Sequence, residues 1–128
     1  MPQSVEQQLL ELTQRLLDSI VEADWPTYEE LCDPTLSAFE PEARGHLVEG
    51  MEFHRYYFNR GPGKTPRNTT MASPRVRLLG DVAIVTYVRL IQAESEAGPA
   101  TAAFEETRVW QLQQGAWRHV HFHRSHPA

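Results

Sequence analysis

Three arginines recur in phase with apolar residues in the C-terminal half of the chain. Arg89, Arg108 and Arg124 lie in segments with strand-like alternation, each two residues from an apolar or aromatic side chain. Successive side chains of a strand point to opposite faces, so this spacing places the guanidinium groups on the same face as core residues. A guanidinium stays charged at any relevant pH, so an inward arginine needs a carboxylate, a carbonyl or an anionic ligand. The chemistry indicated is anion recognition.

Two interpretations of these arginines remain open on spacing alone. Each arginine can form an internal ion pair, for which Glu105 and Glu106 are nearby partners, or reach solvent at a sheet edge. Alternatively, all three converge on one concavity that receives a carboxylate or a phosphate, whose oxygens suit the planar donor fork of arginine.

Histidines alternate along the last predicted strand. We expect His119, His121 and His123 to project from one face together with Trp117. Histidines two residues apart can ligate zinc, but a further ligand would have to come from elsewhere. We therefore expect an interface or sheet-surface role, and no metal.

Acidic residues and the single cysteine carry weaker signals. Asp33, Glu40, Glu42 and Glu49 could suggest paired carboxylates for acid–base chemistry, but their loop context favours solvated or capping roles. Cys32 is expected to be a small buried residue. The sequence contains no phosphate loop, dinucleotide fingerprint or nucleophile elbow, so we expect no cofactor.

The elements that position these residues follow an α+β order. Apolar residues at helical spacing predict a first helix over Ser4–Glu22, opened by a capping box of Ser4 and Gln7. A short second helix capped by Asp24 and a third helix over about Val48–Phe58 follow. The period then changes to two, which predicts an antiparallel meander of four strands. These strands cover about Thr69–Leu79, Val82–Ala93, Phe104–Gln113 and Trp117–Ser125. The long first helix is available to cover one sheet face.

Composition narrows the function classes. With 128 residues the chain suits one domain, over residues 1–128. Its net charge of −5, without a block of Lys and Arg, argues against nucleic-acid binding. One cysteine and a polar start after Met1 favour a cytoplasmic protein. No apolar run approaches the roughly 20 residues needed to cross a membrane.

Three segments carry a resemblance to a known family. They read CDPTLSAFEPEARGHLVEGMEFHRYYF, EETRVW and WRHVHFHRS. In order and spacing they resemble the association (hub) domain of calcium/calmodulin-dependent protein kinase type II, from about Val5 to Ser125. The resemblance implies a cone-shaped nuclear-transport-factor-2-like (cystatin-like) fold, in which a long N-terminal helix packs on a curved antiparallel sheet. Ketosteroid isomerase and scytalone dehydratase share that fold.

The resemblance also implies a function. The family's domain has no chemistry of its own. It forms dimers that close into two stacked rings with twelve or fourteen subunits in total, and kinase domains lie around the rim. The chain contains no kinase sequence, so we expect a non-enzymatic homo-oligomeric scaffold, with a kinase or another domain as a fused or bound partner. The start Met1-Pro2-Gln3-Ser4 runs straight into the capped helix, which favours a stand-alone protein.

Matching motifs imply the pocket residues. In the family, arginines of a deep pocket are presented to small carboxylate ligands, and a loop aromatic folds over it in the animal kinases. The corresponding loop here, Asn59–Asn68, contains no aromatic. The residues implied as ligand-binding are Arg89, Arg108 and Arg124, with His54 at the pocket mouth and Tyr28 on its wall.

A small enzyme of the same fold is the alternative. It would act as an isomerase, dehydratase or hydrolase on an anionic metabolite, because fold alone does not determine function. His54 or Tyr28 would supply the general base, and Arg108 and Arg124 would hold an oxyanion. Against it, no Asp lies on the inward phase of the last two strands, and guanidinium groups are poor proton acceptors.

Overall fold

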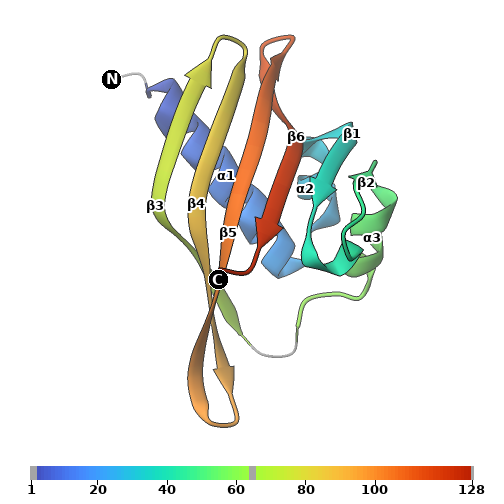
Figure 1. Cartoon of the computed structure of the whole chain (residues 1–128), viewed down its shortest axis with the longest axis vertical. Helices are drawn as coiled ribbons and strands as arrows, with labels where there is room; N and C mark the ends of the chain where they lie inside the picture. The colour runs from blue at the N-terminus through green and yellow to red at the C-terminus, as the bar shows by residue number, and fades with distance from the viewer. Residues whose placement is uncertain (1–2, 64–65, 128) are drawn as a thin grey trace.

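A curved six-stranded sheet with helices against one face forms the described part of the chain (Figure 1), residues 3–63 and 66–127 of a computed structural model. The helices are α1 (Val5–Glu22), α2 (Trp25–Leu31) and α3 (Glu52–Asn59), with a 3₁₀ turn over Pro41–Ala43. The strands are β1 (Cys32–Phe39), β2 (Val48–Glu49), β3 (Arg67–Leu79), β4 (Val82–Ser95), β5 (Gly98–Gln113) and β6 (Ala116–Ser125).

The predicted start of α1 is confirmed in detail. The Ser4 hydroxyl accepts a hydrogen bond from the Gln7 backbone N–H at 3.1 Å, and the Gln7 side chain accepts one from the Ser4 N–H at 3.2 Å. This reciprocal box satisfies two donors that the first helical turn leaves free. Asp24 caps α2, also as predicted, by accepting from the Thr27 N–H.

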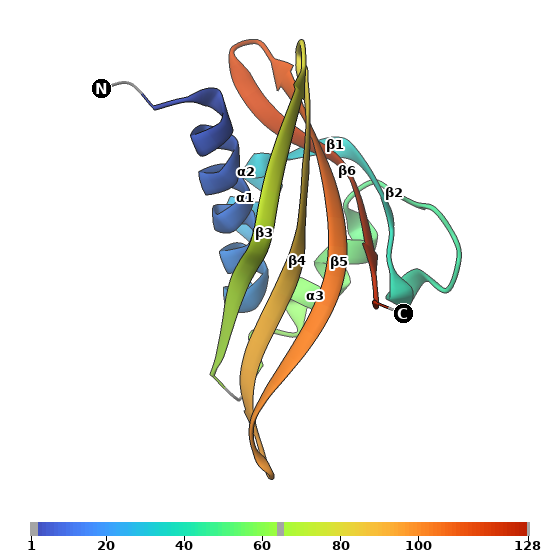
Figure 2. The same cartoon turned by 60° about the vertical axis from the view of Figure 1, so that its left-hand side comes forward.

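The sheet has the strand order β2-β1-β6-β5-β4-β3. Strands β3 to β6 form the predicted antiparallel meander. With the sheet seen nearly edge-on, α1 lies along one side of the curved strands (Figure 2). Leu9, Leu16 and Leu17 of α1 are fully buried in the core that this arrangement encloses.

Two strands, the start of α3 and the start of β5 differ from the sequence prediction; β5 begins at Gly98 rather than near Phe104. Residues Cys32–Phe39 form β1, which contains the pair Asp33-Pro34 and runs parallel to β6, whereas the sequence predicted no strand before about Thr69. Extended backbone is what the residue before a proline favours, so the pair opens a strand here. Val48 and Glu49 pair with β1 as strand β2, and α3 begins only at Glu52.

A bulge in β6 changes the predicted face of its histidines. Trp110 pairs with His119 and Val109 with His121, so Val120 is an extra residue on β6. His119 therefore points into the core, while His121 and His123 lie on the opposite face. The prediction that all three histidines share a face is wrong.

None of the helices in the described ranges combines the length and apolar character needed to cross a membrane. Lys64 and Thr65, part of the loop predicted to lack an aromatic lid, and Met1 and Pro2 of the predicted stand-alone start lie outside the described residues.

Candidate functional site

A cavity of about 300 Å³ opens between the inner sheet face and the helices. All five residues implied as ligand-binding line it, contributed by α2, α3, β4, β5 and β6. The full lining is Ile20, Tyr28, Glu40, Glu42, His54, Tyr57, Phe58, Arg67, Arg89, Ile91, Arg108, Phe122 and Arg124. The structure thus brings the five predicted residues to one place.

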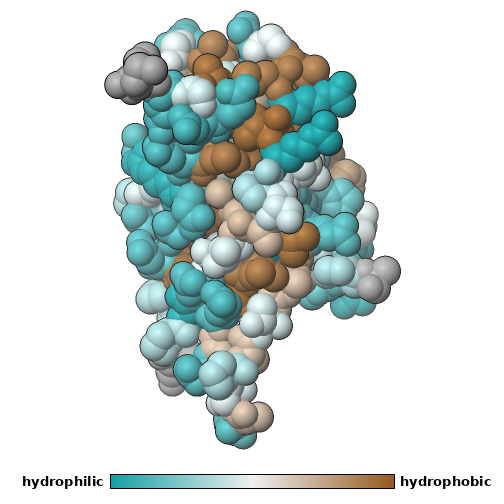
Figure 3. Space-filling model, turned by 90° about the vertical axis from the view of Figure 1, so that its left-hand side faces the viewer, coloured by the Kyte–Doolittle hydropathy of each residue, from teal (hydrophilic) through white to brown (hydrophobic). Residues whose placement is uncertain are grey.

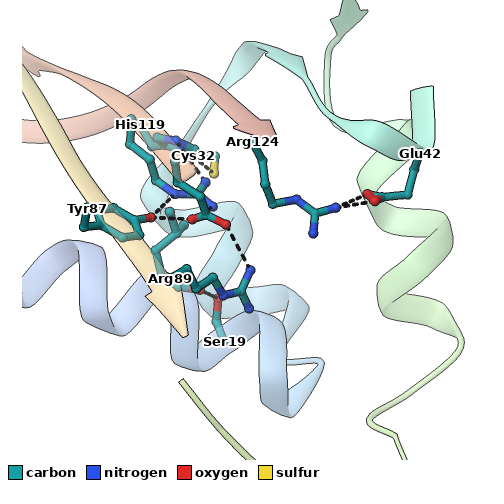
Figure 4. Close-up of polar contacts among 10 residues, drawn as sticks. Ser19, Cys32, Glu42, Tyr87, Arg89, His119 and Arg124 are labelled. Carbon is teal, nitrogen blue, oxygen red and sulfur yellow. Dashed lines mark hydrogen bonds and ion pairs between the residues drawn. The ribbon is translucent and has the colours of Figure 1, made fainter. Parts of the chain in front are cut away.

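A buried ionic cluster forms the floor of this cavity (Figure 4). Arg108, only 1% exposed, donates to a Glu106 carboxylate oxygen at 3.0 Å and to the Tyr87 hydroxyl at 2.8 Å. Tyr87 in turn donates to Glu106 at 2.5 Å, and Arg89 approaches the other Glu106 oxygen at 3.5 Å. One carboxylate therefore serves two arginines, and the predicted ion-pair partner Glu106 is confirmed.

Glu106 remains ionised within this cluster. Burial raises the pKa of its carboxyl, but the Arg108 and Arg89 guanidiniums and the Tyr87 hydroxyl outweigh burial, so the pKa lies below its ordinary value. Burial raises the pKa of Tyr87, which keeps its proton as a donor. Glu105, the other predicted partner, is exposed on the opposite face of β5.

Arg124 lies nearer the cavity mouth and has a different partner. Its guanidinium contacts both carboxylate oxygens of Glu42, a residue of the 3₁₀ turn. The same guanidinium lies over the Phe104 ring, 4.8 Å from the ring centroid. The Arg124 side chain is 15% exposed. Two positive charges of the site are thus held by Glu106 and a third by Glu42.

His54 and Glu40 face each other at the side of the cavity. The His54 Nδ1 lies 3.6 Å from a Glu40 carboxylate oxygen, and both side chains are more than nine-tenths buried. Burial, and then the positive field of Arg108 and Arg124, lowers the pKa of His54 to about 4. Burial, and then the neighbouring Glu42, raises the pKa of Glu40 to about 7. His54 is therefore neutral at neutral pH, and its Nε2 has no hydrogen-bond partner among the described residues.

Tyr28 forms the wall that the resemblance implied. Its ring packs 4.7 Å from Phe58 and 6.1 Å from His54. Burial raises the pKa of the Tyr28 hydroxyl well above its ordinary value, so the phenol is a poor base.

Cys32 and His119 lie behind the cavity floor. The Cys32 Sγ is 3.4 Å from His119 Nδ1, and His119 Nε2 is 3.4 Å from an Arg108 nitrogen. The predicted burial of Cys32 is confirmed, and this burial raises the pKa of its thiol to about 12. Within the described ranges no three His, Cys, Asp or Glu side chains form a cluster that could hold a metal.

Glu40, Glu42 and Tyr87 are the site residues that sequence reasoning missed. Tyr87 shares the inward phase of Arg89, so strand parity could have identified it. Glu40 and Glu42 were expected to be solvated or capping residues. That expectation is wrong for Glu40, whose side chain is 7% exposed, because the unpredicted strand β1 carries it beneath α3.

Nearly the whole chain is similar to one family of known proteins. The family profile described as calcium/calmodulin dependent protein kinase II association domain matches residues 5–128. The delta subunit of calcium/calmodulin-dependent protein kinase type II from Oryctolagus cuniculus is 46% identical over 124 residues, which are 94% of this chain. The chain spans 23% of that relative's length.

Solved structures of association (hub) domains are also similar to this chain. The hub homology domain of Chlamydomonas reinhardtii aligns with a TM-score of 0.90 at 46% identity, over 98% of this chain and all of that one. The association domain from C. elegans aligns with a TM-score of 0.88 at 47% identity, over 94% of each chain. A nuclear-transport-factor-2-like protein from Cytophaga hutchinsonii, 21% identical, aligns with a TM-score of 0.80 over 98% of this chain and all of the other, and shares the fold.

Proposed function

Because this chain belongs to the calcium/calmodulin-dependent protein kinase II association-domain family, we propose that it is an oligomerisation scaffold built from stacked rings of dimers. Each subunit would carry an arginine-lined pocket for a small carboxylate. The observation that carries the scaffold proposal is the family match over residues 5–128. The chain's own action would be non-enzymatic and cytoplasmic. A kinase or other domain, fused or bound, would be the assembly's cargo.

The uncovered face of the sheet supports self-association. Apolar side chains on its outward phase are only partly buried, although an outer antiparallel face is commonly polar. They are Ile84, Val88 and Leu90 of β4 and Val109 of β5. At the sheet edge formed by β3, hydrophobic side chains also make a broken band among hydrophilic ones (Figure 3), and Leu78 and Leu79 are exposed. Apolar patches of this kind mark interaction surfaces.

The lining of the cavity supports the carboxylate proposal. Four guanidiniums line it against two carboxylates, and Glu106 lies below. Arg67 contributes a further positive charge near the Arg89 end. Ile20, Phe58 and Ile91 provide apolar surface beside these charges, which suits a small organic acid whose body is hydrophobic.

The native mass of the purified protein tests the scaffold. We expect light scattering or native mass spectrometry to give twelve or fourteen subunits of 14.7 kDa. A monomer or an isolated dimer at micromolar concentration would contradict the ring assembly.

Calorimetric titration with phenylacetate tests the pocket. We expect binding that weakens about tenfold or more in Arg124→Met, because a hydrogen bond to a charged group contributes roughly 1.5–3 kcal/mol. Arg77→Met, on the exposed edge strand β3, is the matched control and should bind like the wild type. Equal affinity of the two variants would refute the assignment of Arg124.

The His54–Glu40 contact favours a second candidate, a small enzyme acting on an anionic metabolite. Neutral His54 could accept a proton beside Arg108 and Arg124, which would hold an oxyanion. A screen of carboxylate metabolites tests this. Turnover that is abolished in His54→Ala would replace the scaffold-only function.

A further inference from the structure

Glu40 is a buried carboxyl group that forms no ion pair with an arginine in the part of the chain that the structure describes. It follows the last residue of β1 and precedes the 3₁₀ turn, in extended backbone that directs it into the cavity. Its side chain is 7% exposed, and its closest polar contact is the neutral His54 at 3.6 Å. Arg89 and Arg108 are held by Glu106, and Arg124 by Glu42.

Charged and titratable groups face Glu40 from every element packed around it. They are Tyr28 of α2, Glu42 of the 3₁₀ turn, His54 of α3, Glu106 and Arg108 of β5, and Arg124 of β6. The two arginines favour the ionised form of Glu40. Burial and the two glutamates favour the protonated form, and burial is the largest of these effects.

A carboxylate that enters this cavity to reach Arg108 and Arg124 also comes close to Glu40. Two ionised carboxylates held together in a buried site repel each other strongly. One proton removes the repulsion and converts Glu40 into a hydrogen-bond donor to the ligand. His54 cannot supply this proton at neutral pH, because it is itself neutral.

We propose that Glu40 is a proton-binding site of the pocket, and that a carboxylate ligand is taken up together with one proton that the two carboxyl groups share. This inference rests on the proposed carboxylate pocket. In the bound state, the ligand carboxyl group and the Glu40 carboxyl group together carry one proton and one negative charge. Glu40 therefore determines both the class of ligand that binds and how binding depends on pH.

The titration range of Glu40 agrees with this geometry. With its pKa raised to about 7, Glu40 is largely protonated at pH 6 and largely ionised at pH 8. Phenylacetate is ionised at both values. If only the protonated pocket binds it, the apparent Kd rises about tenfold from pH 6 to pH 8.

Isothermal titration of the assembled wild-type protein with phenylacetate tests the proposal. Measurements at pH 8 in triethanolamine and in Tris, which differ in ionisation enthalpy and add no phosphate that could compete for the arginines, give the number of protons taken up with the ligand. We expect close to one proton per phenylacetate at pH 8, little uptake at pH 6, and a Kd about tenfold weaker at pH 8.

The Glu40→Gln variant supplies an independent test. Its amide is a permanent neutral donor of nearly the same shape, so binding should keep the wild-type pH 6 affinity at pH 8 and take up no proton. Glu11→Gln makes the same change on the exposed side of α1 and should retain the tenfold pH dependence.

The outcomes separate this inference from the pocket itself. Binding with equal Kd at both pH values and no proton uptake would overturn proton coupling and leave the carboxylate pocket intact. Pronounced pH dependence that persists in Glu40→Gln would overturn the assignment to Glu40. An absence of binding at either pH would overturn both. Wild-type proton uptake decides the question if Glu40→Gln does not fold.

Discussion

At the scale of single residues, the site depends on one carboxylate that compensates two buried arginines. Glu106 accepts from Arg108 and Tyr87 and pairs with Arg89, and all of these groups are nearly out of contact with water. Removing charges from water is costly, so each member is stable inside only while its partners remain. The predicted arginines can line a pocket because this carboxylate, absent from the predicted ligand-binding set, holds two of them in place.

Glu106→Gln should therefore be strongly destabilising. It would leave Arg89 and Arg108 buried without a counter-charge, a situation that costs roughly 3–5 kcal/mol. Urea unfolding at fixed protein concentration measures the change. Glu11→Gln is the control, because Glu11 is exposed on α1 and lies outside the proposed interface, and it should stay within about 0.5 kcal/mol of the wild type. Similar losses in both variants would argue against the buried cluster.

The opposite pKa shifts of Glu40 and His54 predict how stability depends on pH. Glu40 titrates at about 7 in the folded chain rather than 4.5, so the folded state binds more protons between these values and its stability falls as pH rises through them. His54 titrates at about 4 rather than 6.5, so the folded state binds fewer protons and stability rises from pH 4 to 6.5. The two effects oppose each other below pH 6.5.

Thermal unfolding of Glu40→Gln should separate the pH dependence of stability contributed by Glu40 from that contributed by His54. Without Glu40, the wild-type fall in stability towards pH 7 disappears, and the rise contributed by His54 between pH 4 and 6.5 becomes steeper. The melting temperature is measured in steps across pH 4 to 8, and Glu11→Gln is measured beside it as the control. A variant whose profile parallels that of the wild type would mean that Glu40 titrates normally.

At the scale of elements, α1 and the bulge of β6 determine where the site can form. Helix α1 buries Leu9, Leu16 and Leu17 against the inner sheet face, and its last turn brings Ile20 to the cavity. The extra residue Val120 turns His119 inward beside Arg108 while keeping Phe122 and Arg124 on the cavity side. Bulges often re-aim side chains next to functional sites in this way.

Leu16→Ala should test the packing of α1 on the sheet. The side chain is fully buried, so its truncation removes apolar contacts and leaves a cavity, at a cost of about 2–5 kcal/mol. Chemical unfolding measures the loss. Glu11→Ala, on the exposed side of the same helix, should change stability by less than about 0.5 kcal/mol. A small loss in Leu16→Ala would mean that α1 packs loosely.

At the scale of the whole molecule, the two sheet faces have separate roles. The inner face carries the ionic cluster and the cavity, and the outer face presents partly buried apolar side chains that no described helix covers. Val88 lies near the middle of this outer face, between Ala72 of β3 and Glu105 of β5. The proposed assembly would bury this surface without closing the pocket.

Val88→Lys should dissociate the proposed rings while the subunit still folds. A lysine can extend into solvent from an exposed strand, but at a buried interface its charge would have no partner. We expect a much lower native mass with an unchanged circular-dichroism spectrum. Glu11→Lys on α1 serves as the control and should keep the wild-type mass. Rings that survive Val88→Lys would place the interface elsewhere.

The sequence by itself determined the α+β order, the caps of α1 and α2, and the inward phase of Arg89 and Arg108. These features follow from helical and strand periods and from hydrogen bonds between residues three apart, so they are local. Only the tertiary structure decided that β1 lies beside β6, that Val120 forms a bulge, and that Arg124 pairs with Glu42, 82 residues away. Such pairings depend on which distant segments pack together, and no local period records that choice.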